Sequence, residues 1–395
     1  MRRIVMLAPA ACLACVCGSA MADGLKPART SLDDMRVLQK AFAAAAQAVA
    51  PSVVTVVADR KAGGSLSVRQ VRVHHGRVQI RRGAAWRPAP GAGTGVVISP
   101  DGLILTSTHY TTGRLKKVLV VMPDGTPYEA KALGRDAGRQ VSLLKIELEE
   151  GQTLPVPAFV DPDEVRVGQW VMALGRTYGE LDPSVNVGIV SATGRIAGRA
   201  VQTDAPISPI NYGGPLVDIK GRVVGVCTPM SNSPRRRGTQ FYDSGIGFAV
   251  PVTDVLRVVP RLLDGAVLHP GFLGVQFDTA RVKPGAAITR VVADSAAAKA
   301  GLKPKDVITE CDGKSLRHAF DLMNRVGRKY VGEKVSLKVL RSTHVLDFTV
   351  TLGKRPTPRP RTRPTTRPTT RRTRRPTTRR AATTRPAHGR AGGDQ

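Results

Sequence analysis

Short apolar runs, four to six residues long, recur from about residue 53 to residue 251. Leucine and β-branched residues dominate these runs, and Asp-Gly pairs at residues 101–102 and 124–125 supply hairpin turns. Many short strands with almost no helical periodicity are typical of an all-β barrel or sandwich. We therefore predict strands at residues 53–57, 95–98, 103–106, 118–121 and 141–146.

A helical pattern precedes this β-rich region. Apolar residues recur at helical spacing in an Ala- and Gln-rich run that ends near Val49, and Ser31 to Asp34 resembles a capping box with Asp in place of Glu. Because Pro51 ends the pattern, we predict one helix within residues 23–50. Residues 60–90 have weak periodicity, which favours a long loop or an exposed hairpin.

The pattern changes again near Leu268, where strands and helices mix. We predict a strand from Val275, a helix at 294–300, a strand at 306–311 followed by an Asp-Gly turn, a helix around 317–326, and strands between 335 and 352. About 85 residues of this kind form a small separate domain, which we place at residues 266–353.

The first 22 residues are typical of a signal peptide. Arg2 and Arg3 precede an apolar stretch at 4–17, and an A-x-A site predicts cleavage after Ala22. The stretch is shorter than the roughly 20 residues that span a bilayer. A lipoprotein cut before Cys15 or Cys17 is the alternative, but leucine is missing at the usual place upstream. We expect an exported, soluble protein, periplasmic or extracellular.

Charge is strongly positive and uneven along the chain. There are 60 Lys and Arg against 30 Asp and Glu, a net charge of +30, and residues 354–395 contribute +13. This Thr/Arg/Pro-rich end has no large apolar side chain, so we predict a disordered basic tail. A basic chain attracts polyanions in a salt-dependent way. Because the tail has no aromatic residues to stack on bases and the protein is expected to be exported, we expect no nucleic acid as a partner. Acidic envelope polymers or anionic lipids fit better, and a tail that only keeps the protein in solution is an equal alternative.

The cysteines and histidines predict no metal site and no cofactor. Three of the five cysteines leave with the signal peptide, and Cys227 and Cys311 fall in different domains. Two buried thiols are therefore expected rather than a disulfide or a zinc site, which needs about four clustered ligands. His74 and His75 have no carboxylate or cysteine nearby, so we assign them to a solvated loop.

Several segments together resemble the HtrA (DegP-like) family of chymotrypsin-fold proteases. They follow one another along the chain: GTGVVIS at 93–99, GLILTSTH at 102–109, residues 134–147, NVGIVS at 186–191, residues 203–217 and GIGFAVP at 245–251. The later module resembles the family's PDZ domain, so the resemblance covers about residues 35–353. It implies a mainly β fold, with a chymotrypsin-type double β-barrel at 51–262, an α+β PDZ domain and the basic tail.

The resemblance also assigns the catalytic positions. The histidine base falls on His109 and is retained, whereas the aspartate falls on Gln140 and the nucleophilic serine on Tyr212. Ile210 stands where the family has a glycine two places before the serine. Asn211 and the following Gly-Gly-Pro fix the alignment at this point.

These replacements remove the chemistry of a serine protease. Gln140 has no charge to offset an imidazolium, and losing the carboxylate alone costs about 10⁴ in rate in a well-studied protease. Loss of the nucleophile costs roughly 10⁶ in another. The phenol of Tyr212 has a reference pKa of about 10, so it is mostly protonated at neutral pH. We therefore predict no peptide cleavage by the serine mechanism.

The PDZ-like module keeps a loop that suits peptide binding. Backbone N–H groups of residues 271–274 can bind a terminal carboxylate, and the strand from Val275 can pair with an extended peptide. One face of the later helix, with 0, 3, 4, 7 spacing from Ala319, lines the groove or fills the core. The predicted peptide-binding residues are Phe272, Leu273, Gly274, Val275, Leu322, Met323 and Val326.

The leading hypothesis is an exported pseudoprotease that binds peptides or unfolded segments and acts as a chaperone, scaffold or regulator. The resemblance implies a trimer and permits assembly with active relatives. One alternative is an active envelope endopeptidase with an unrecognised nucleophile, for which Ser208 is a poor candidate because it precedes the turn. Another is a polyanion-binding envelope protein. Residues 235–237, all arginine, border the cleft in the related proteases and either favour acidic ligands or form a solvated charge run.

Overall fold

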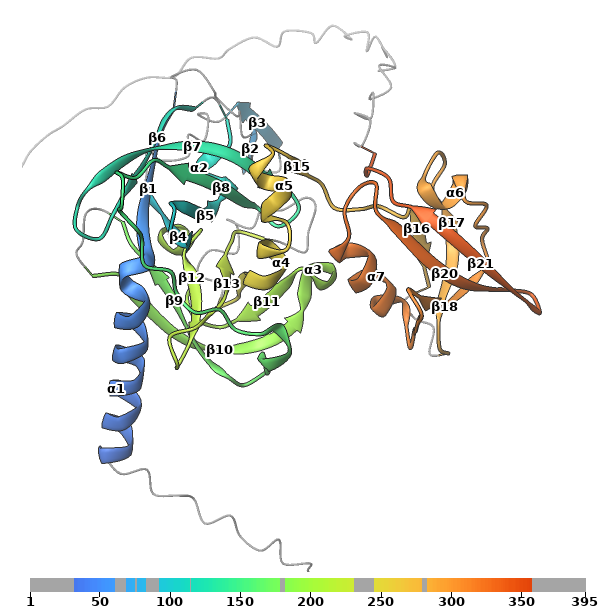
Figure 1. Ribbon diagram of the computed structural model, residues 1–395. Coiled ribbons are helices and arrows are strands. Elements are labelled where there is room, and N and C mark those ends of the chain that lie inside the picture. Colours follow the sequence, from blue (N-terminus) through green and yellow to red (C-terminus); the bar gives the residue numbers. More distant parts are fainter. Residues whose placement is uncertain are drawn as a thin grey trace, which may run out of the picture. The chain divides into compact units, whose positions relative to one another are not determined.

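The computed structural model describes residues 32–60, 69–74, 77–82, 92–113, 115–177, 182–230, 245–278 and 283–356. Two closed six-stranded barrels and a smaller α+β domain account for most of these residues (Figure 1). The predicted fold class, mainly β with a double barrel and a PDZ-like module, is confirmed. The signal peptide, residues 235–237 and the tail beyond Pro356 lie outside the described residues.

The first barrel contains every strand predicted for its part of the chain. Its strands run in the order β7-β6-β1-β4-β5-β8, and pairing of β7 with β8 closes it. Gly102 and Gly125 adopt left-handed φ values of 99° and 89° at the two Asp-Gly turns, which glycine tolerates at no steric cost. The bounds are β1 Val53–Arg60, β4 Ala92–Ser99, β5 Leu103–Ser107, β6 Leu115–Val121, β7 Pro127–Asp136 and β8 Val141–Ile146.

The second barrel closes in the order β10-β11-β14-β13-β12-β9. One hydrophobic cluster joins the two barrels, because it combines Val96 and Leu105 of the first with Val226, Phe248 and Val250 of the second. The residues between the barrels are thereby held on a rigid base. The bounds are β9 Trp170–Gly175, β10 Ser184–Gly194, β11 Ala200–Thr203, β12 Pro215–Asp218, β13 Val223–Cys227 and β14 Gly247–Pro251.

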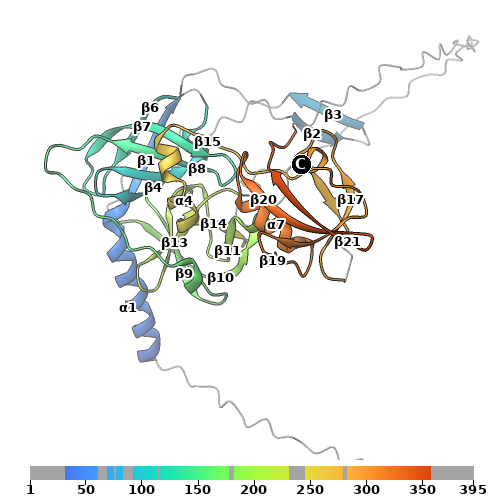
Figure 2. The same ribbon diagram turned by 45° about the vertical axis from the view of Figure 1, so that its right-hand side comes forward.

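The predicted N-terminal helix is confirmed as α1 (Leu32–Val49), followed by the short helix η1 (Ala50–Ser52) with Pro51 in it. The C-terminal half of α1 packs on the second barrel, where Ala45 and Val49 join Met172 and Val217 in one cluster. The first half extends away from the barrels in both views (Figures 1 and 2). The predicted loop or hairpin at 60–90 contains a hairpin of β2 (Arg69–His74) and β3 (Arg77–Arg82), whereas His75 lies outside the described residues.

The connection to the PDZ domain belongs partly to the first barrel. After α4 (Val252–Leu256) and α5 (Val259–Leu263), the two-residue strand β15 (Val267–Leu268) pairs in parallel with β7. Leu268 is 3% exposed and joins the cluster between the barrels. The strand pairing therefore ties residues 267–268, which we assigned to the PDZ domain, to the barrel.

The PDZ domain is a sheet in the order β16-β17-β18-β20-β21, with β19 beside β18. The predicted helices and strands occur at the expected places, and one hydrophobic cluster fills the domain. Figure 2 shows the long β20–β21 hairpin and α7. The bounds are β16 Val275–Phe277, β17 Ala286–Val291, α6 Ala296–Lys299, β18 Val307–Cys311, β19 Lys314–Ser315, α7 Ala319–Arg328, β20 Lys334–Arg341 and β21 His344–Thr351.

The remaining expectations concern the cysteines, metal ligands and membrane helices. Cys227 and Cys311 are both free and buried. In the described ranges no group of three or more His, Cys, Asp or Glu side chains is placed to hold a metal ion. None of the helices described is both long and apolar enough to cross a membrane.

Candidate functional site

The three triad positions come together where the two barrels meet. His109 lies on the short helix α2 (Thr108–Thr111) after β5, Gln140 in the turn between β7 and β8, and Tyr212 just before β12. The backbone N–H of Thr108 donates to the Gln140 carbonyl at 2.9 Å. The rings of His109 and Tyr212 meet edge to face, with centroids 5.7 Å apart. The structure thus brings together the three positions that the family resemblance assigns to the triad, with His109 and Tyr212 in ring contact and Gln140 joined through its backbone.

Gln140 contributes its backbone to this arrangement. Its φ of 59° is left-handed, which is uncommon for a residue with a Cβ. Its carbonyl also accepts a hydrogen bond from the Ser107 hydroxyl at 3.4 Å. The turn therefore fixes the start of α2 and with it the position of His109.

Tyr212 is 3% exposed, and its backbone is fully engaged. Its N–H donates to the Pro209 carbonyl at 3.1 Å, and its carbonyl accepts from Thr94 N–H at 3.3 Å. The Tyr110 hydroxyl also donates to the Pro209 carbonyl. In a serine protease the N–H of the nucleophile residue helps to stabilise the oxyanion. Here that donor is directed at a carbonyl of the protein.

The turn that holds this arrangement is η3 (Pro209–Asn211). Several hydrogen bonds fix its position. The Asn211 side chain accepts from the N–H and the hydroxyl of Ser208, both at 3.1 Å. The Thr94 hydroxyl donates to the Ile210 carbonyl at 2.6 Å. Gly213 follows with φ of 90°, and a Cβ there would lie 2.2 Å from the Thr94 carbonyl oxygen. Only glycine fits at that position.

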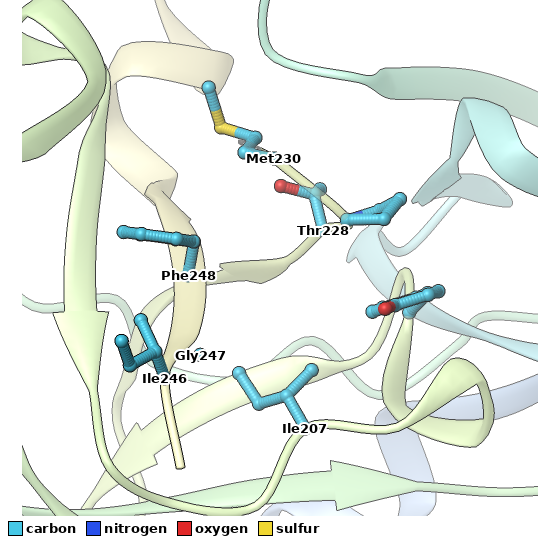
Figure 3. Close-up of a pocket in the computed structure, with 8 residues that line it drawn as sticks. Ile207, Thr228, Met230, Ile246, Gly247 and Phe248 are labelled. Atoms are coloured by element: carbon cyan, nitrogen blue, oxygen red, sulfur yellow. The ribbon is translucent and has the colours of Figure 1, made fainter. Parts of the chain in front are cut away.

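A shallow pocket adjoins Tyr212, with a cavity volume of about 10 Å³, room for roughly one water molecule. Figure 3 shows Ile207, Ile246, Phe248 and Met230 around it. The lining residues are Ile207, Tyr212, Thr228, Pro229, Met230, Ile246, Gly247 and Phe248.

Two other groups near Tyr212 are chemically able to act as nucleophiles, and neither is suited to it. The Cys227 thiol is fully buried, and burial raises its pKa to about 12, so the reactive thiolate is scarce at neutral pH. The Ser208 hydroxyl is bonded to the Asn211 side chain. Sequence analysis discounted Ser208 for its place before the turn, and this contact gives a structural reason.

A buried ionic cluster follows directly from the aspartate position. Arg139, next to Gln140, is 1% exposed and pairs with Asp136 and Asp254, both at 3.2 Å. It also donates to the hydroxyl of Tyr330, a residue of the PDZ domain, and Tyr330 donates to Asp136 at 2.5 Å. Burial lowers the pKa of Arg139, but Tyr330, Asp136 and Asp254 together hold it above its ordinary value. Sequence analysis missed this cluster, because its members are up to 194 residues apart.

Backbone hydrogen bonds and close packing fix the loop at residues 271–274. The carbonyls of Leu273 and Gly274 accept from Ala297 and Val292, each at 2.8 Å. Within the described ranges, no acceptor is recorded for the N–H groups of Leu273 and Gly274. Gly274 has φ of 88°, and a Cβ there would lie 2.1 Å from the Cβ of Ser295. Two adjacent backbone donors are thus held in place for an anion.

The predicted groove residues divide into two groups. Leu273, Leu322 and Val326 are buried in the PDZ core, and Val275 packs against that core while half-buried. Met323 is 40% exposed and so presents apolar surface to a ligand. Phe320, one turn before it and 52% exposed, was not predicted, although its 0, 3 spacing to Met323 could have indicated a shared face.

Comparison with protein families identifies two modules. A model described as a trypsin-like peptidase domain matches residues 93–226, and one described as a PDZ domain matches residues 271–352. A probable periplasmic serine endoprotease, DegP-like, from Chlamydia trachomatis is 35% identical over 281 residues, which cover 67% of this chain and 54% of that protein. A protein of the same name from Marinomonas is 37% identical over 279 residues, covering 67% and 57%. The chain spans little more than half the length of the curated relatives it matches.

Solved structures agree with this relationship. The HtrA-type protease AlgW with tripeptide aligns at a TM-score of 0.60 and 29% identity, covering 80% of this chain and 98% of that one. The serine endoprotease from Yersinia pestis aligns at a TM-score of 0.54 and 28% identity, with the same coverage.

Proposed function

We propose that this chain binds ligands and no longer cleaves peptides. The premise is that it is an HtrA-like member of the trypsin-like serine proteases with a C-terminal PDZ domain. In this proposal it is a pseudoprotease that binds peptides or unfolded protein segments, as a chaperone, scaffold or regulator. The expected ligands are chain ends with a free carboxylate.

The observation that carries the proposal is the state of Tyr212. Its side chain stands where the family has serine, its ring packs against His109, and its N–H donates to Pro209. A substrate carbonyl would therefore meet neither an activated hydroxyl nor this oxyanion donor. Catalytic stabilisation by such donors is worth about 2.7–4 kcal/mol for a single one. The pocket beside Tyr212 is shallow, and Tyr212 itself forms part of its lining.

The PDZ loop supports the binding half of the proposal. Leu273 and Gly274 present adjacent N–H groups, β16 lies beyond them, and Met323 offers exposed apolar surface. These are the parts that β-augmentation requires: donors for a carboxylate, a strand edge and a side-chain site. One structure similar to this chain is described as an HtrA-type protease with tripeptide.

The same comparison supports a proposal for the location, and the family resemblance supports one for the assembly. The relatives are named periplasmic, and the predicted signal peptide supports export of this chain. We extend the proposal to an exported, periplasmic protein that assembles as a homotrimer or with active relatives.

Peptide titration tests the binding half. A fluorescent decapeptide with a free apolar C-terminus should bind, and the same peptide with an amidated C-terminus should bind at least tenfold more weakly. Met323→Asp should also weaken binding, because a charge replaces an exposed apolar contact. We prefer Met323→Asp to Leu273→Asp, since Leu273 is 4% exposed and a charge there would disrupt the core. Equal binding of the free and amidated peptides would refute carboxylate recognition.

A protease assay tests the catalytic half. Purified protein incubated with unfolded casein and a serine-directed phosphonate probe should give neither cleavage nor labelling. The His109→Ala variant is the control, because it removes the retained base. Robust cleavage that disappears in His109→Ala would establish an active endopeptidase and overturn the pseudoprotease proposal.

A further inference from the structure

The first residues of the basic tail lie against the carboxylate loop. Phe272 N–H donates to the Gly353 carbonyl at 2.9 Å, and Gly353 N–H donates to the Phe272 carbonyl at 3.2 Å. This bridge continues the chain past the loop after β21 ends. Two residues later, the guanidinium carbon of Arg355 lies 4.8 Å from the centroid of the Phe272 ring. The tail therefore places its first arginine at the loop.

The Phe272 ring connects this arginine to the carboxylate donors. An edge carbon of the ring lies 3.4 Å from the position that a Cβ of Gly274 would occupy. Arg355 packs over the same ring, so its charge and the two N–H groups lie on either side of one side chain of the loop. Stacking on an aromatic face holds a guanidinium in place and leaves its N–H edges available to an anion.

The charge of Arg355 is not neutralised by the described part of the protein. No carboxylate of the described residues lies within ion-pair distance of it. Its charge acts on Arg199, whose pKa is lowered by burial and further by the Arg139 and Arg355 cations, with Asp136 opposing. The guanidinium of Arg199 donates to the Gly138 carbonyl and lies beside Pro270, just before the loop. The loop thus stands in a positive potential.

The rest of the PDZ domain also carries a net positive charge, which adds to the positive potential at the loop. Residues 271–355 contain 16 Lys and Arg against eight Asp and Glu. Several of the carboxylates are already committed to other cations: Asp306 to Arg341, Asp312 to Lys329 and Glu333 to Arg261. An incoming anion meets little opposing charge at the loop.

We infer that Arg355 is a specificity-determining residue of this site, which selects peptides carrying an acidic side chain next to their terminal carboxylate. The terminal carboxylate binds the N–H groups of Leu273 and Gly274, and the guanidinium of Arg355 pairs with the second carboxylate. This inference rests on the proposed peptide binding and names the class of ligand.

The test compares labelled decapeptides on the full chain. One peptide ends in Gly-Ala-Val-Ala-Val, two others carry glutamate at the penultimate or the last position, and a fourth carries the glutamate at its N-terminus. We expect one of the two C-terminal glutamates to improve binding about three- to fivefold, since exposed ion pairs contribute on the order of 0.2–1 kcal/mol. The N-terminal glutamate should not, which separates local recognition from general attraction by the basic chain.

Arg355→Gln should abolish the preference for the acidic peptide over the neutral one, whatever its effect on the binding of both. Lys354→Gln is the matched control, because it removes the same charge one residue away without the stacking on Phe272. It should leave the preference in place. Raising the salt from 150 to 500 mM should reduce the preference in the parent protein by screening.

The outcomes distinguish the two proposals. If no peptide binds the parent protein, the proposed function fails and the inference fails with it. If neutral and acidic peptides bind equally well, or if Lys354→Gln has the same effect as Arg355→Gln, peptide binding stands and the role of Arg355 is refuted.

Discussion

Tyr212 differs from the nucleophile residue of a serine protease in both its side chain and the engagement of its backbone N–H. Its phenol replaces a nucleophile, but its backbone N–H is also committed to Pro209, and that carbonyl accepts from Tyr110 as well. Restoring a hydroxyl at this position therefore changes one group out of several. In the proposed pseudoprotease, the site therefore departs from an active one in its nucleophile, its carboxylate and one oxyanion donor together.

Tyr212→Ser alone should accordingly not restore proteolysis. Gln140 supplies no charge to stabilise an imidazolium, and the N–H of residue 212 still donates to Pro209. We expect casein hydrolysis below detection and no labelling by a phosphonate probe, with an active HtrA-type protease as positive control. Measurable turnover from this one substitution would contradict our view that Gln140 and the engaged N–H of residue 212 also prevent catalysis.

At the scale of the element, the PDZ domain depends on an ion pair between two strands. Asp306, just before β18, receives two hydrogen bonds of 2.8 Å from Arg341 at the end of β20, and a third from Lys303 N–H. Asp306 is 1% exposed. Burial raises the pKa of this carboxyl, but the Arg341 and Lys303 hydrogen bonds outweigh it and hold the pKa below its ordinary value.

Asp306→Asn should lower the free energy of unfolding by about 2 kcal/mol at pH 7, since it weakens charge-assisted hydrogen bonds. A carboxyl whose pKa is depressed by folding contributes stability above its unfolded pKa, about 3.9, and loses it as the pH falls through the folded value. The difference between parent and variant should therefore shrink below pH 4. Urea unfolding at pH 7 and pH 3 measures it, with exposed Asp347→Asn as the control that changes neither value.

At the scale of the whole molecule, the cluster around Arg139 joins the barrels to the PDZ domain. Tyr330 contributes its hydroxyl to Arg139 and Asp136, and its ring lies 5.1 Å from the guanidinium carbons of both Arg139 and Arg261. Asp254 and the Arg328 carbonyl complete the set of partners. Since Gln140 follows Arg139 directly, the cluster also anchors the turn beneath His109.

Tyr330→Phe should lower the free energy of unfolding by about 1–3 kcal/mol, because Asp136 and Arg139 lose a hydrogen-bond partner in a buried place. It should also make the segment around residues 264–270 more accessible to limited proteolysis. Tyr128→Phe is the matched control, since its hydroxyl bonds only the exposed Gln152 among the described residues. Unchanged stability and unchanged proteolysis of Tyr330→Phe would show that the cluster does not hold the domains together.

Most of the fold was predictable from the chain. The strands of the first barrel, the helix that ends at Pro51 and the elements of the PDZ domain follow local patterns of apolar residues, glycine and proline, and the structure confirms them. The residues of the candidate site could be named from the sequence, but the contacts that these residues make could not. Leu322, Met323 and Val326 share a periodic pattern, yet only their packing separates the buried pair from exposed Met323.

The local pattern of residues was sufficient to predict the order of the elements and the barrel and PDZ modules. It also sufficed to propose that two residues at the triad positions are replaced. Each of these predictions depends on residues close together in the chain. Tertiary structure alone decided how those residues are used. The bond between Tyr110 and Pro209 joins positions 99 residues apart, and Arg355 reaches Phe272 only because Gly353 pairs with it. Tyr212 is likewise buried between the two barrels because of the conformation of η3. Packing between segments that are distant in the chain sets that conformation.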